Sequence, residues 1–590
     1  MLQKSVQIQR NSADYFSTQP VLLYLGARDF RPVAYTRHKG WRILRAACKS
    51  QGSAALTCRH DPSLIFSIYN EVVLRMTDNA AINSAPHHHE VLGHPKGLFI
   101  CFGTEMWERF SFYGMKYLLL LYLTKYHLFT DEAGLGVLGS YAALVYAMPV
   151  IGGLIADRYL GMRRAVVFGG LLLVAGHLGM ALEGEQARLV GDTLIRDTGA
   201  IQVFYFSLAL IVMGVGFLKP NISTVVGKLY ADDDPRRDAG FTIFYMGINL
   251  GAFTATLLCG WLGEVYGWAY GFGAAGIGML FGLGLFLWGQ DTLQGHGEAP
   301  DTDKLKQPIL GPISLEWLIY GVSAAGVFVV WQLIQFTALV GTVLNVVSAL
   351  VAILLAWFLL SRCTKIERER MFVLIVLTLS TVVFWALFEQ AAGSMTLFAD
   401  RATDRSLFGV ELTAAQFGAA NSFFIFTLAP LFAILWTRLG KRGLEPNTPI
   451  KFTLGIAQAG LGFGVLAYGA QFPNEAGLVS AWWLILAYLL HTTGELCLSP
   501  VGLSAVTKLA VPKVVGVMMG TWFLATAYSS YVAAQLAAVA TSAANTAASA
   551  VDNVDRFIPL FDQLFWTGLI AAAVLLTLTP VLKRLMHGIH

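Results

Sequence analysis

The sequence predicts an all-α membrane protein that crosses the bilayer many times. Of its 590 residues, 56% are hydrophobic and only 13% are charged, whereas about a quarter of the residues of a typical soluble domain are charged. Apolar runs of about 20 residues, long enough to span a bilayer as helices, recur from residue 97 to the C-terminus. The alternating apolar and polar strands of a membrane β-barrel do not occur in the sequence.

Fourteen segments of the sequence fit helical spans, and their even number places both termini on one side of the membrane. The predicted spans are 97–124, 133–156, 163–183, 201–229, 239–262, 266–289, 313–336, 341–361, 370–394, 414–438, 449–470, 480–508, 513–541 and 559–586.

Basic residues are distributed unequally between the two sets of loops. One set carries twenty Lys and Arg, and the other carries six, namely Lys125, Arg188, Arg196, Arg401, Arg405 and Arg556. Because basic loops stay in the cytoplasm, we expect a multi-pass protein of the inner (cytoplasmic) membrane with both termini cytoplasmic.

The N-terminal segment, residues 1–96, is predicted to be cytoplasmic. Residues 1–75 are basic and contain no apolar stretch of membrane length. At Met76 the sequence changes to MTDNAAINSAPHHHEVLGHPKG, a short polar leader before the first span. We therefore expect Met76 to be the natural start, with residues 1–75 either non-native or disordered.

A polar stretch, QDTLQGHGEAPDTDKLKQP, follows the sixth span and divides the chain. It places a six-helix bundle at 97–289 and a cytoplasmic linker at 290–312. The next two spans, 313–361, carry charge only at their edges and are predicted as an inserted helical pair. A second six-helix bundle is predicted at 370–590.

The turn between the second and third spans reads GGLIADRYLGMRR (152–164). Its Gly-x-Leu-x-Asp-Arg core resembles the signature of the major facilitator superfamily. This resemblance implies a major facilitator fold of two six-helix bundles, which the inserted pair extends to 14 transmembrane helices. We expect Asp157, near a cytoplasmic helix end, to pair with an arginine of this loop.

Several ionisable residues lie inside the predicted spans. They are Glu105, Glu108, Arg109, Lys116, Lys219, Glu389 and Glu495. A charge at the bilayer centre costs about 2.5–3.5 kcal/mol on insertion scales, so such residues face water or a partner and mark candidate functional sites. The alternative is a set of ion pairs that only fix helix packing.

Four of these charges belong to one stripe on the first span. At helical spacing, Glu105, Glu108, Arg109, Phe112, Tyr113 and Lys116 fall within one arc of roughly 140°. Glu105 and Arg109 also stand four residues apart in the order that favours an ion pair. Such a stripe can line a cavity and pass protons, because neighbouring carboxylates and cations control each other's protonation.

Five motifs in register, from about residue 97 to 586, resemble those of the proton-dependent oligopeptide transporter (POT or PTR) family. The first, GTEMWERFSFYGMK (103–116), is similar to the family's ExxERFxYYG motif. The others are GVGFLKPN (214–221), FTIFYMGINLGAF (241–253), WALFEQ (385–390) and GELCLSPVGLSAVTKLAVP (494–512). Bacterial members also carry the inserted helical pair.

The resemblance implies a peptide site between the two bundles. The peptide carboxylate would bind Lys116 and Lys219, and the amino group would bind Glu495, assisted by Asn249 and Asn421. Side-chain pockets would be formed by Tyr113, Tyr146, Trp385 and Trp522, with Thr526 where serine is common. Proton coupling would belong to Glu105, Glu108, Arg109 and Glu389. Gating would use the pair Lys116 and Glu389 on the periplasmic side and the pair Lys219 and Glu495 on the cytoplasmic side.

Some of these positions allow a purely structural interpretation. Asn249 and Asn421 could hydrogen-bond helices together, and Tyr146 and Trp522 could be packing aromatics.

The chain also departs from the family pattern. Phe112 replaces a tyrosine. Lys116 stands where many members have arginine, and lysine keeps the positive charge but cannot form the two parallel hydrogen bonds of an arginine. Gly139 occupies the position of a proton-sensing histidine found in some members, and His491 is the nearest candidate on another helix.

The family implies a symporter that imports di- and tripeptides with protons by alternating access. We expect a monomer in the lipid bilayer, with no cofactor other than protons, no metal and no nucleic acid. The first alternative is a family member specialised for nitrate or modified peptides. The second is a drug or sugar facilitator, whose site should lack the Lys and Glu pair. The sequence contains no P-loop, nucleophile elbow or HExxH motif, so we do not expect an enzyme.

Overall fold

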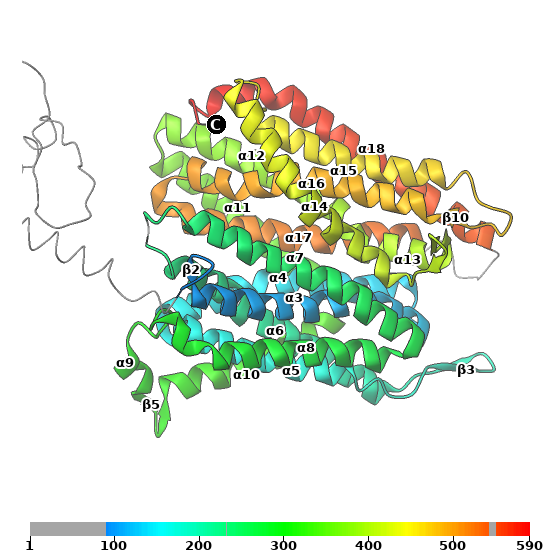
Figure 1. The fold of residues 1–590 in the computed structure, drawn as a ribbon, viewed down its shortest axis with the longest axis horizontal. Helices are drawn as coiled ribbons and strands as arrows, with labels where there is room; N and C mark the ends of the chain where they lie inside the picture. Colours follow the sequence, from blue (N-terminus) through cyan, green and yellow to red (C-terminus); the bar gives the residue numbers. More distant parts are fainter. Residues whose placement is uncertain (1–89, 232, 542–549, 590) are drawn as a thin grey trace, which may run out of the picture. The chain divides into compact units, whose positions relative to one another are not determined.

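The computed structural model describes residues 90–231, 233–541 and 550–589, and helices dominate these ranges (Figure 1). The predicted segment 1–75, and all but the last residues of 1–96, lie outside the described residues.

Fourteen long helices correspond to the fourteen predicted spans. The first six are α3 (Lys96–Leu121), α4 (Asp131–Ile155), α5 (Met162–Met180), α6 (Thr198–Lys228), α7 (Arg237–Trp261) and α8 (Trp268–Trp288). The inserted pair is α10 (Leu315–Gln335) and α11 (Thr337–Arg362). The last six are α12 (Lys365–Phe388), α14 (Ala419–Lys441), α15 (Thr448–Gly469), α16 (Ala481–Leu509), α17 (Val515–Thr541) and α18 (Ala550–Leu585). Each predicted span overlaps one helix, although α18 begins earlier than predicted.

Within the described residues, 12 helical segments are long and apolar enough to cross a membrane. The two long helices outside this set are α3 and α17. α3 carries its stripe of charged residues, and α17 is rich in Ala, Gly, Ser and Thr, which lowers its hydropathy. Both pack among the other spans, so the chain is a multi-pass, all-α membrane protein.

Glycines let the helices of the first bundle approach closely. A Cβ atom added to Gly152 of α4 would lie 2.1 Å from the carbonyl oxygen of Gly216 on α6. On α5, a Cβ atom at Gly169 would lie 2.6 Å from the carbonyl oxygen of Gly214. Helices in lipid associate by this close packing, because lipid gives them no hydrophobic driving force toward one another.

The two predicted bundles meet along α4 with α17 and along α7 with α14. At the first interface, a Cβ atom at Gly139 would lie 2.3 Å from the Cβ atom of Ala534. The other extensive helix contacts, such as those of α5 with α6 and of α15 with α18, lie within 97–289 or within 370–590. We keep the predicted domain boundaries as a proposal that these contacts support.

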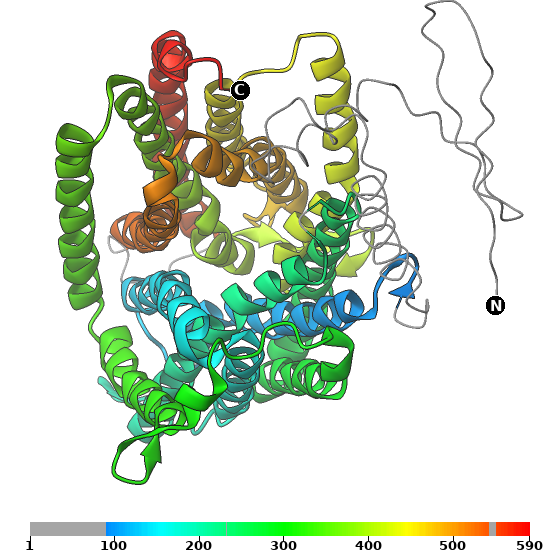
Figure 2. The same cartoon turned by 90° about the vertical axis from the view of Figure 1, so that its left-hand side faces the viewer.

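The inserted pair lies at the edge of the helix assembly (Figure 2). Large apolar side chains on both helices are exposed, among them Phe328 on α10 and Trp357 on α11, as expected for surfaces that face lipid. α10 packs against α6, and α11 touches α4 and α17. The Tyr528 hydroxyl of α17 donates a hydrogen bond to Asn345 on α11 (2.9 Å).

The ninth predicted span, 370–394, is broken in the structure. α12 ends at Phe388, a 3-10 turn (η6, Glu389–Ala392) follows, and a separate helix, α13 (Ser394–Arg401), completes the segment. Hydropathy did not locate this break, which falls in the sequence EQAAGS (389–394) within the predicted span. The break places Glu389 at the point where the two helices separate.

Short elements connect the spans, and the sequence analysis did not predict the strands. Antiparallel pairs are β1 (Glu90–Val91) with β2 (His94–Pro95), β3 (Arg188–Val190) with β4 (Thr193–Ile195), β5 (Pro308–Leu310) with β6 (Ile313–Ser314), and β8 (Ser406–Leu407) with β9 (Val410–Glu411). β7 (Thr403–Asp404) pairs in parallel with β10 (Val479–Ser480). The turns at Gly191, Gly311 and Gly409 have positive φ angles, 61°, 60° and 79°, a conformation that glycine adopts without strain.

The loop GGLIADRYLGMRR does not use Asp157 as predicted. Arg163 binds Glu298 and donates a hydrogen bond to Gln290 (2.7 Å), and Arg164 lies 3.3 Å from Glu316 of α10. Asp157 forms an ion pair with neither arginine. That prediction is wrong, because the acidic residues of the linker and of α10 occupy the arginines of the loop.

The helix assembly has two ends, which we call outer and inner. The outer ends are those near α13 and the β3–β4 hairpin, and the inner ends are those near α9 (Thr302–Lys306) (Figure 1). The last residues of α18 lie at the inner ends.

Candidate functional site

The stripe on α3 faces the protein interior. Glu105, Glu108, Arg109 and Lys116 expose 2%, 0%, 3% and 7% of their surfaces. Gly114 lies in the same stretch, and a Cβ atom there would lie 2.7 Å from the sulfur of Cys259 on α7. α3 therefore packs tightly against α7 while its charged residues point toward other charges.

Arg109 holds the two glutamates of this motif together. Its guanidinium is bidentate to Glu108, with one hydrogen bond of 2.5 Å from Nη2 to Oε1 and a second from Nε to Oε2. The Arg109 Nε atom also lies 3.3 Å from Oε1 of Glu105. The second oxygen of Glu105, Oε2, is buried without a hydrogen-bond partner among the described residues. Both oxygens of Glu108 thus accept hydrogen bonds from Arg109, whereas Glu105 keeps one oxygen available for a proton.

Phe112, the departure from the family's tyrosine, lies between two cations. Its ring centroid is 5.1 Å from the Cζ atom of Arg109 and 6.0 Å from the Nζ atom of Lys116. An aromatic face stabilises cations at such distances. These contacts between the ring and the two cations need no hydroxyl group, so phenylalanine can make them.

Lys116 and Glu389 join the two bundles. The Nζ atom of Lys116 lies 2.8 Å from Oε2 of Glu389, and each side chain is only 8% exposed. Glu389 begins the 3-10 turn η6, so the break after α12 directs its carboxylate toward α3. The predicted periplasmic gate pair is formed in this structure, while its role in gating stays a prediction.

Lys219 on α6 has no ion-pair partner within the described part of the chain. Its Nζ atom lies 5.2 Å from the ring centroid of Tyr146 on α4. Pro220, the next residue in α6, cannot donate a backbone hydrogen bond. A half-buried lysine above an aromatic ring is a suitable receptor for an anionic group.

Glu495 on α16 is the acidic counterpart in the other bundle. Asn421 on α14 donates a hydrogen bond to its Oε2 (3.1 Å) and another to the Thr492 hydroxyl (3.0 Å). No lysine or arginine pairs with Glu495 in the described chain. In particular, Lys219 and Glu495 do not form the predicted inner gate pair in this structure.

The remaining predicted residues differ in what they contact. Asn249 is buried and donates a hydrogen bond to the Tyr245 carbonyl of its own helix (3.1 Å). The Thr526 hydroxyl donates a hydrogen bond to the Trp522 carbonyl of its own helix (3.2 Å). Trp522 is 6% exposed and packs against Gly502 and Phe452. Trp385 packs edge-to-face on Phe384 and Phe388. Tyr113 is partly buried and packs edge-to-face on Phe112.

Two histidines lie inside spans. His491, the candidate from the sequence, has its Nε2 atom 3.1 Å from the carbonyl oxygen of Ala459 and packs on Phe463. His177 on α5 is completely buried, and neither ring nitrogen has a hydrogen-bond partner among the described residues. His177 is not among the residues predicted from the sequence, although its position inside an apolar run was a signal.

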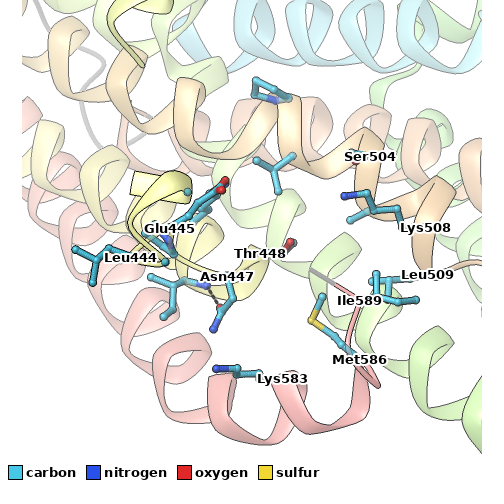
Figure 3. Close-up of a pocket in the computed structure, with 18 residues that line it drawn as sticks. Leu444, Glu445, Asn447, Thr448, Ser504, Lys508, Leu509, Lys583, Met586 and Ile589 are labelled. Atoms are coloured by element: carbon cyan, nitrogen blue, oxygen red, sulfur yellow. Dashed lines mark hydrogen bonds and ion pairs between the residues drawn. The ribbon is translucent and has the colours of Figure 1, made fainter. Parts of the chain in front are cut away.

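A crevice of about 880 Å³ lies away from this site. It lies at the inner ends of α15, α16 and α18 and is lined by Lys451, Lys508 and Lys583, among others (Figure 3). None of the predicted site residues lines it. Burial and charge therefore identify the site better than the size of an open space does.

Sequence reasoning also missed the contacts that join the bundles at their outer ends. Arg401 of α13 is bidentate to Asp131, the first residue of α4, with distances of 2.6 and 2.7 Å. Lys125 lies 2.7 Å from Asp400, and Glu264 accepts a hydrogen bond from the Ala415 amide (2.8 Å). These residues lie outside the apolar cores of the spans, and their pairing across 151 to 275 residues cannot be inferred from spacing.

Comparison with known proteins agrees with this geometry. The POT family profile matches residues 163–554. The chain is 37% identical over 525 residues to the transporter YclF of Bacillus subtilis, covering 87% of this chain and 99% of that protein. It is 35% identical to the peptide transporter YePEPT of Yersinia enterocolitica, covering 86% and 98%, and 33% identical to a di-/tripeptide transporter of Lactococcus lactis, covering 84% and 98%.

Solved structures show the same fold. A peptide transporter of this family in complex with alafosfalin has a TM-score of 0.71 and 37% identity, covering 85% of this chain and 97% of that chain. A POT family transporter in complex with 5-aminolevulinic acid has a TM-score of 0.70 and 29% identity, covering 85% and 99%. The fold, the buried charges and these relatives agree: the chain belongs to the POT family of secondary transporters and is not an enzyme.

Proposed function

We propose that this protein imports di- and tripeptides together with protons across the cytoplasmic membrane. The observation that carries the proposal is a pair of opposite charges, Lys219 on one bundle and Glu495 on the other, that have no ionic partner among the described residues. A peptide has a carboxylate at one end and an ammonium group at the other, so it complements both. The names of the Yersinia and Lactococcus relatives support the same substrate class.

The residue roles predicted from the sequence fit this arrangement. Lys116 and Lys219 would hold the carboxylate, and Glu495, hydrogen-bonded by Asn421, would hold the amine. Tyr113, Tyr146, Trp385, Trp522, Thr526 and Asn249 would shape the site. Because Trp522 is buried against Gly502 and Phe452 and Asn249 is hydrogen-bonded to the Tyr245 carbonyl, we expect their contribution to be mainly structural support.

Alternating access follows from which ion pairs are formed. Here the outer pair Lys116–Glu389 is closed, and the inner residues Lys219 and Glu495 are apart. We propose that the outer ends face the periplasm and the inner ends face the cytoplasm, so the structure represents an inward-facing state. Protonation of Glu389 would release Lys116 and allow the outer side to open. We further propose an inner-membrane location, cytoplasmic termini and a monomer.

The second candidate function is the transport of a narrower range of substrates. The neighbour that binds 5-aminolevulinic acid shows that this fold accepts a small molecule with an amine and a carboxylate. Nitrate lacks the amine and would leave Glu495 unpaired, which makes nitrate the weaker alternative.

Counterflow tests the substrate class without a proton gradient. We expect proteoliposomes loaded with unlabelled dialanine to accumulate labelled dialanine, and external dialanine to compete while nitrate does not. Empty liposomes give the background. Absence of counterflow with purified, monodisperse protein would refute the peptide assignment.

A further inference from the structure

Three lysines from three different helices line the crevice at the inner ends of α15, α16 and α18. Lys451 lies near the start of α15, Lys508 in the last turn of α16 and Lys583 in the last turn of α18. The proposed transport site uses none of them. We propose that this crevice is a binding site for the phosphate headgroup of an anionic phospholipid.

The lysine on α15 belongs to a fixed wall of the crevice. The Nζ atom of Lys451 donates a hydrogen bond to Oε1 of Glu445 (2.5 Å) and lies 4.8 Å from the ring centroid of Trp436. Its side chain is only 10% exposed. Among the described residues that line the crevice, Glu445 is the acidic one. Because its carboxylate is bound to Lys451, the other two lysines leave the crevice with a net positive charge.

The groups that a ligand would meet are hydrogen-bond donors. Figure 3 shows Lys508 and Lys583 at the crevice, together with Thr448 and Ser504, whose side chains carry hydroxyl groups. Lys583 has no ion-pair or hydrogen-bond partner among the described residues. Ammonium and hydroxyl groups can donate to the oxygens of a phosphate, and bonds between charged partners are the stronger ones. The lining therefore fits an anion with several acceptor oxygens.

The position of the crevice along the helices fits a lipid headgroup. Lys508 and Lys583 both stand in the last turns of their helices, where a span meets the water. Leu576 precedes Lys583 by seven residues, so it lies on the same face of α18, about 10 Å nearer the bilayer centre. It exposes 53% of its surface, as expected for a side chain that faces an acyl chain. A molecule with a phosphate and apolar chains matches both features.

The side of the membrane and the size of the crevice favour a lipid over a free phosphate ion. The three lysines belong to the set of loops with twenty basic residues, which we expect on the cytoplasmic side. Basic pockets between membrane helices on this side bind the headgroups of anionic lipids. The volume of about 880 Å³ is also far more than one phosphate ion needs, because pockets of about 300–1,000 Å³ hold drug-sized ligands.

Native mass spectrometry of the purified full-length chain in detergent measures lipid binding directly. The probes are cardiolipin, whose headgroup carries two phosphates, and phosphatidylcholine, which has no net charge. We expect the parent to bind cardiolipin more tightly than phosphatidylcholine. In Lys508→Gln combined with Lys583→Gln, the affinity for cardiolipin should fall about 25-fold, because each lysine near an anionic lipid contributes about fivefold.

A matched control removes the same charge elsewhere on the inner surface. Lys304 and Lys306 belong to α9 and do not line the crevice. Lys304→Gln combined with Lys306→Gln should therefore leave the affinity for cardiolipin at the level of the parent. A large molar excess of inorganic phosphate should not displace cardiolipin from the parent, because phosphate lacks the apolar chains.

Three results would overturn the proposal. Unchanged affinity for cardiolipin in the variant of Lys508 and Lys583, with a normal gel-filtration profile, would leave these lysines only the role of cations at helix C-termini. An equal loss in the control variant would show that binding follows the net charge of the inner surface. Displacement by phosphate would make the crevice a site for a soluble anion. Binding is measured without peptide, so none of these results bears on the proposed transport.

Discussion

Glu495→Gln should lower the binding affinity for a dipeptide with a free amino group by about 10- to 100-fold, because a hydrogen bond to a charged group contributes about 1.5–3 kcal/mol. The variant keeps the shape of the side chain and can keep the hydrogen bond from Asn421. It removes the negative charge that the ammonium group would meet. N-acetylated dialanine, which has no ammonium group, should bind the variant and the parent equally.

The measurement is inhibition of dialanine counterflow by each of the two ligands. Glu369→Gln is the matched control, because Glu369 contacts His587 at the inner surface, away from the proposed site. An equal loss for both ligands in Glu495→Gln would assign Glu495 a structural role and remove the main support for amine recognition.

Glu105→Gln should lower the proton-driven accumulation of peptide by more than about tenfold. The rate of counterflow should stay within about threefold of the parent. Glu105 has one oxygen near Arg109 and a second, buried oxygen without a partner. A proton on that oxygen neutralises the carboxylate without breaking the bidentate contact of Arg109 with Glu108. The glutamine variant imitates the protonated state permanently, so binding continues while the coupling to protons is lost.

Arg109→Gln provides the contrast. It leaves two buried carboxylates without their cation, and uncompensated buried charges cost about 3–5 kcal/mol. We expect this variant to lose thermal stability and both transport activities, whereas Glu105→Gln loses only the gradient-driven one. Gradient-driven uptake by Glu105→Gln at the level of the parent would exclude Glu105 as the proton carrier.

The spans and the buried stripe could be predicted because both depend on local sequence. Each span is an apolar run, and the stripe on α3 follows from helical periodicity. A charge inside such a run requires a partner, which made Glu389 and Lys116 candidates before their contact of 2.8 Å was known. The resemblance of the five motifs then supplied the pairing that spacing alone could not give.

Other features depend on contacts between distant segments. The break at Glu389 falls inside the predicted span 370–394, and hydropathy did not locate it. The bidentate contact of Arg401 with Asp131 joins residues 270 positions apart at the ends of helices, where charged residues are ordinarily solvated. Asp157 shows the opposite error: a local partner was expected, but Glu298 and Glu316 bind the arginines instead. Trp522 and Asn249 are buried among protein atoms, which the motif could not reveal.

Gradient-driven uptake in proteoliposomes tests proton-coupled peptide import most directly. With an inside-negative and inside-alkaline gradient, we predict that labelled dialanine accumulates above its external concentration and that a protonophore abolishes the accumulation. If counterflow is normal but the gradient drives no accumulation, the protein carries peptides without protons, and the proposed role of Glu105, Glu108, Arg109 and Glu389 is wrong.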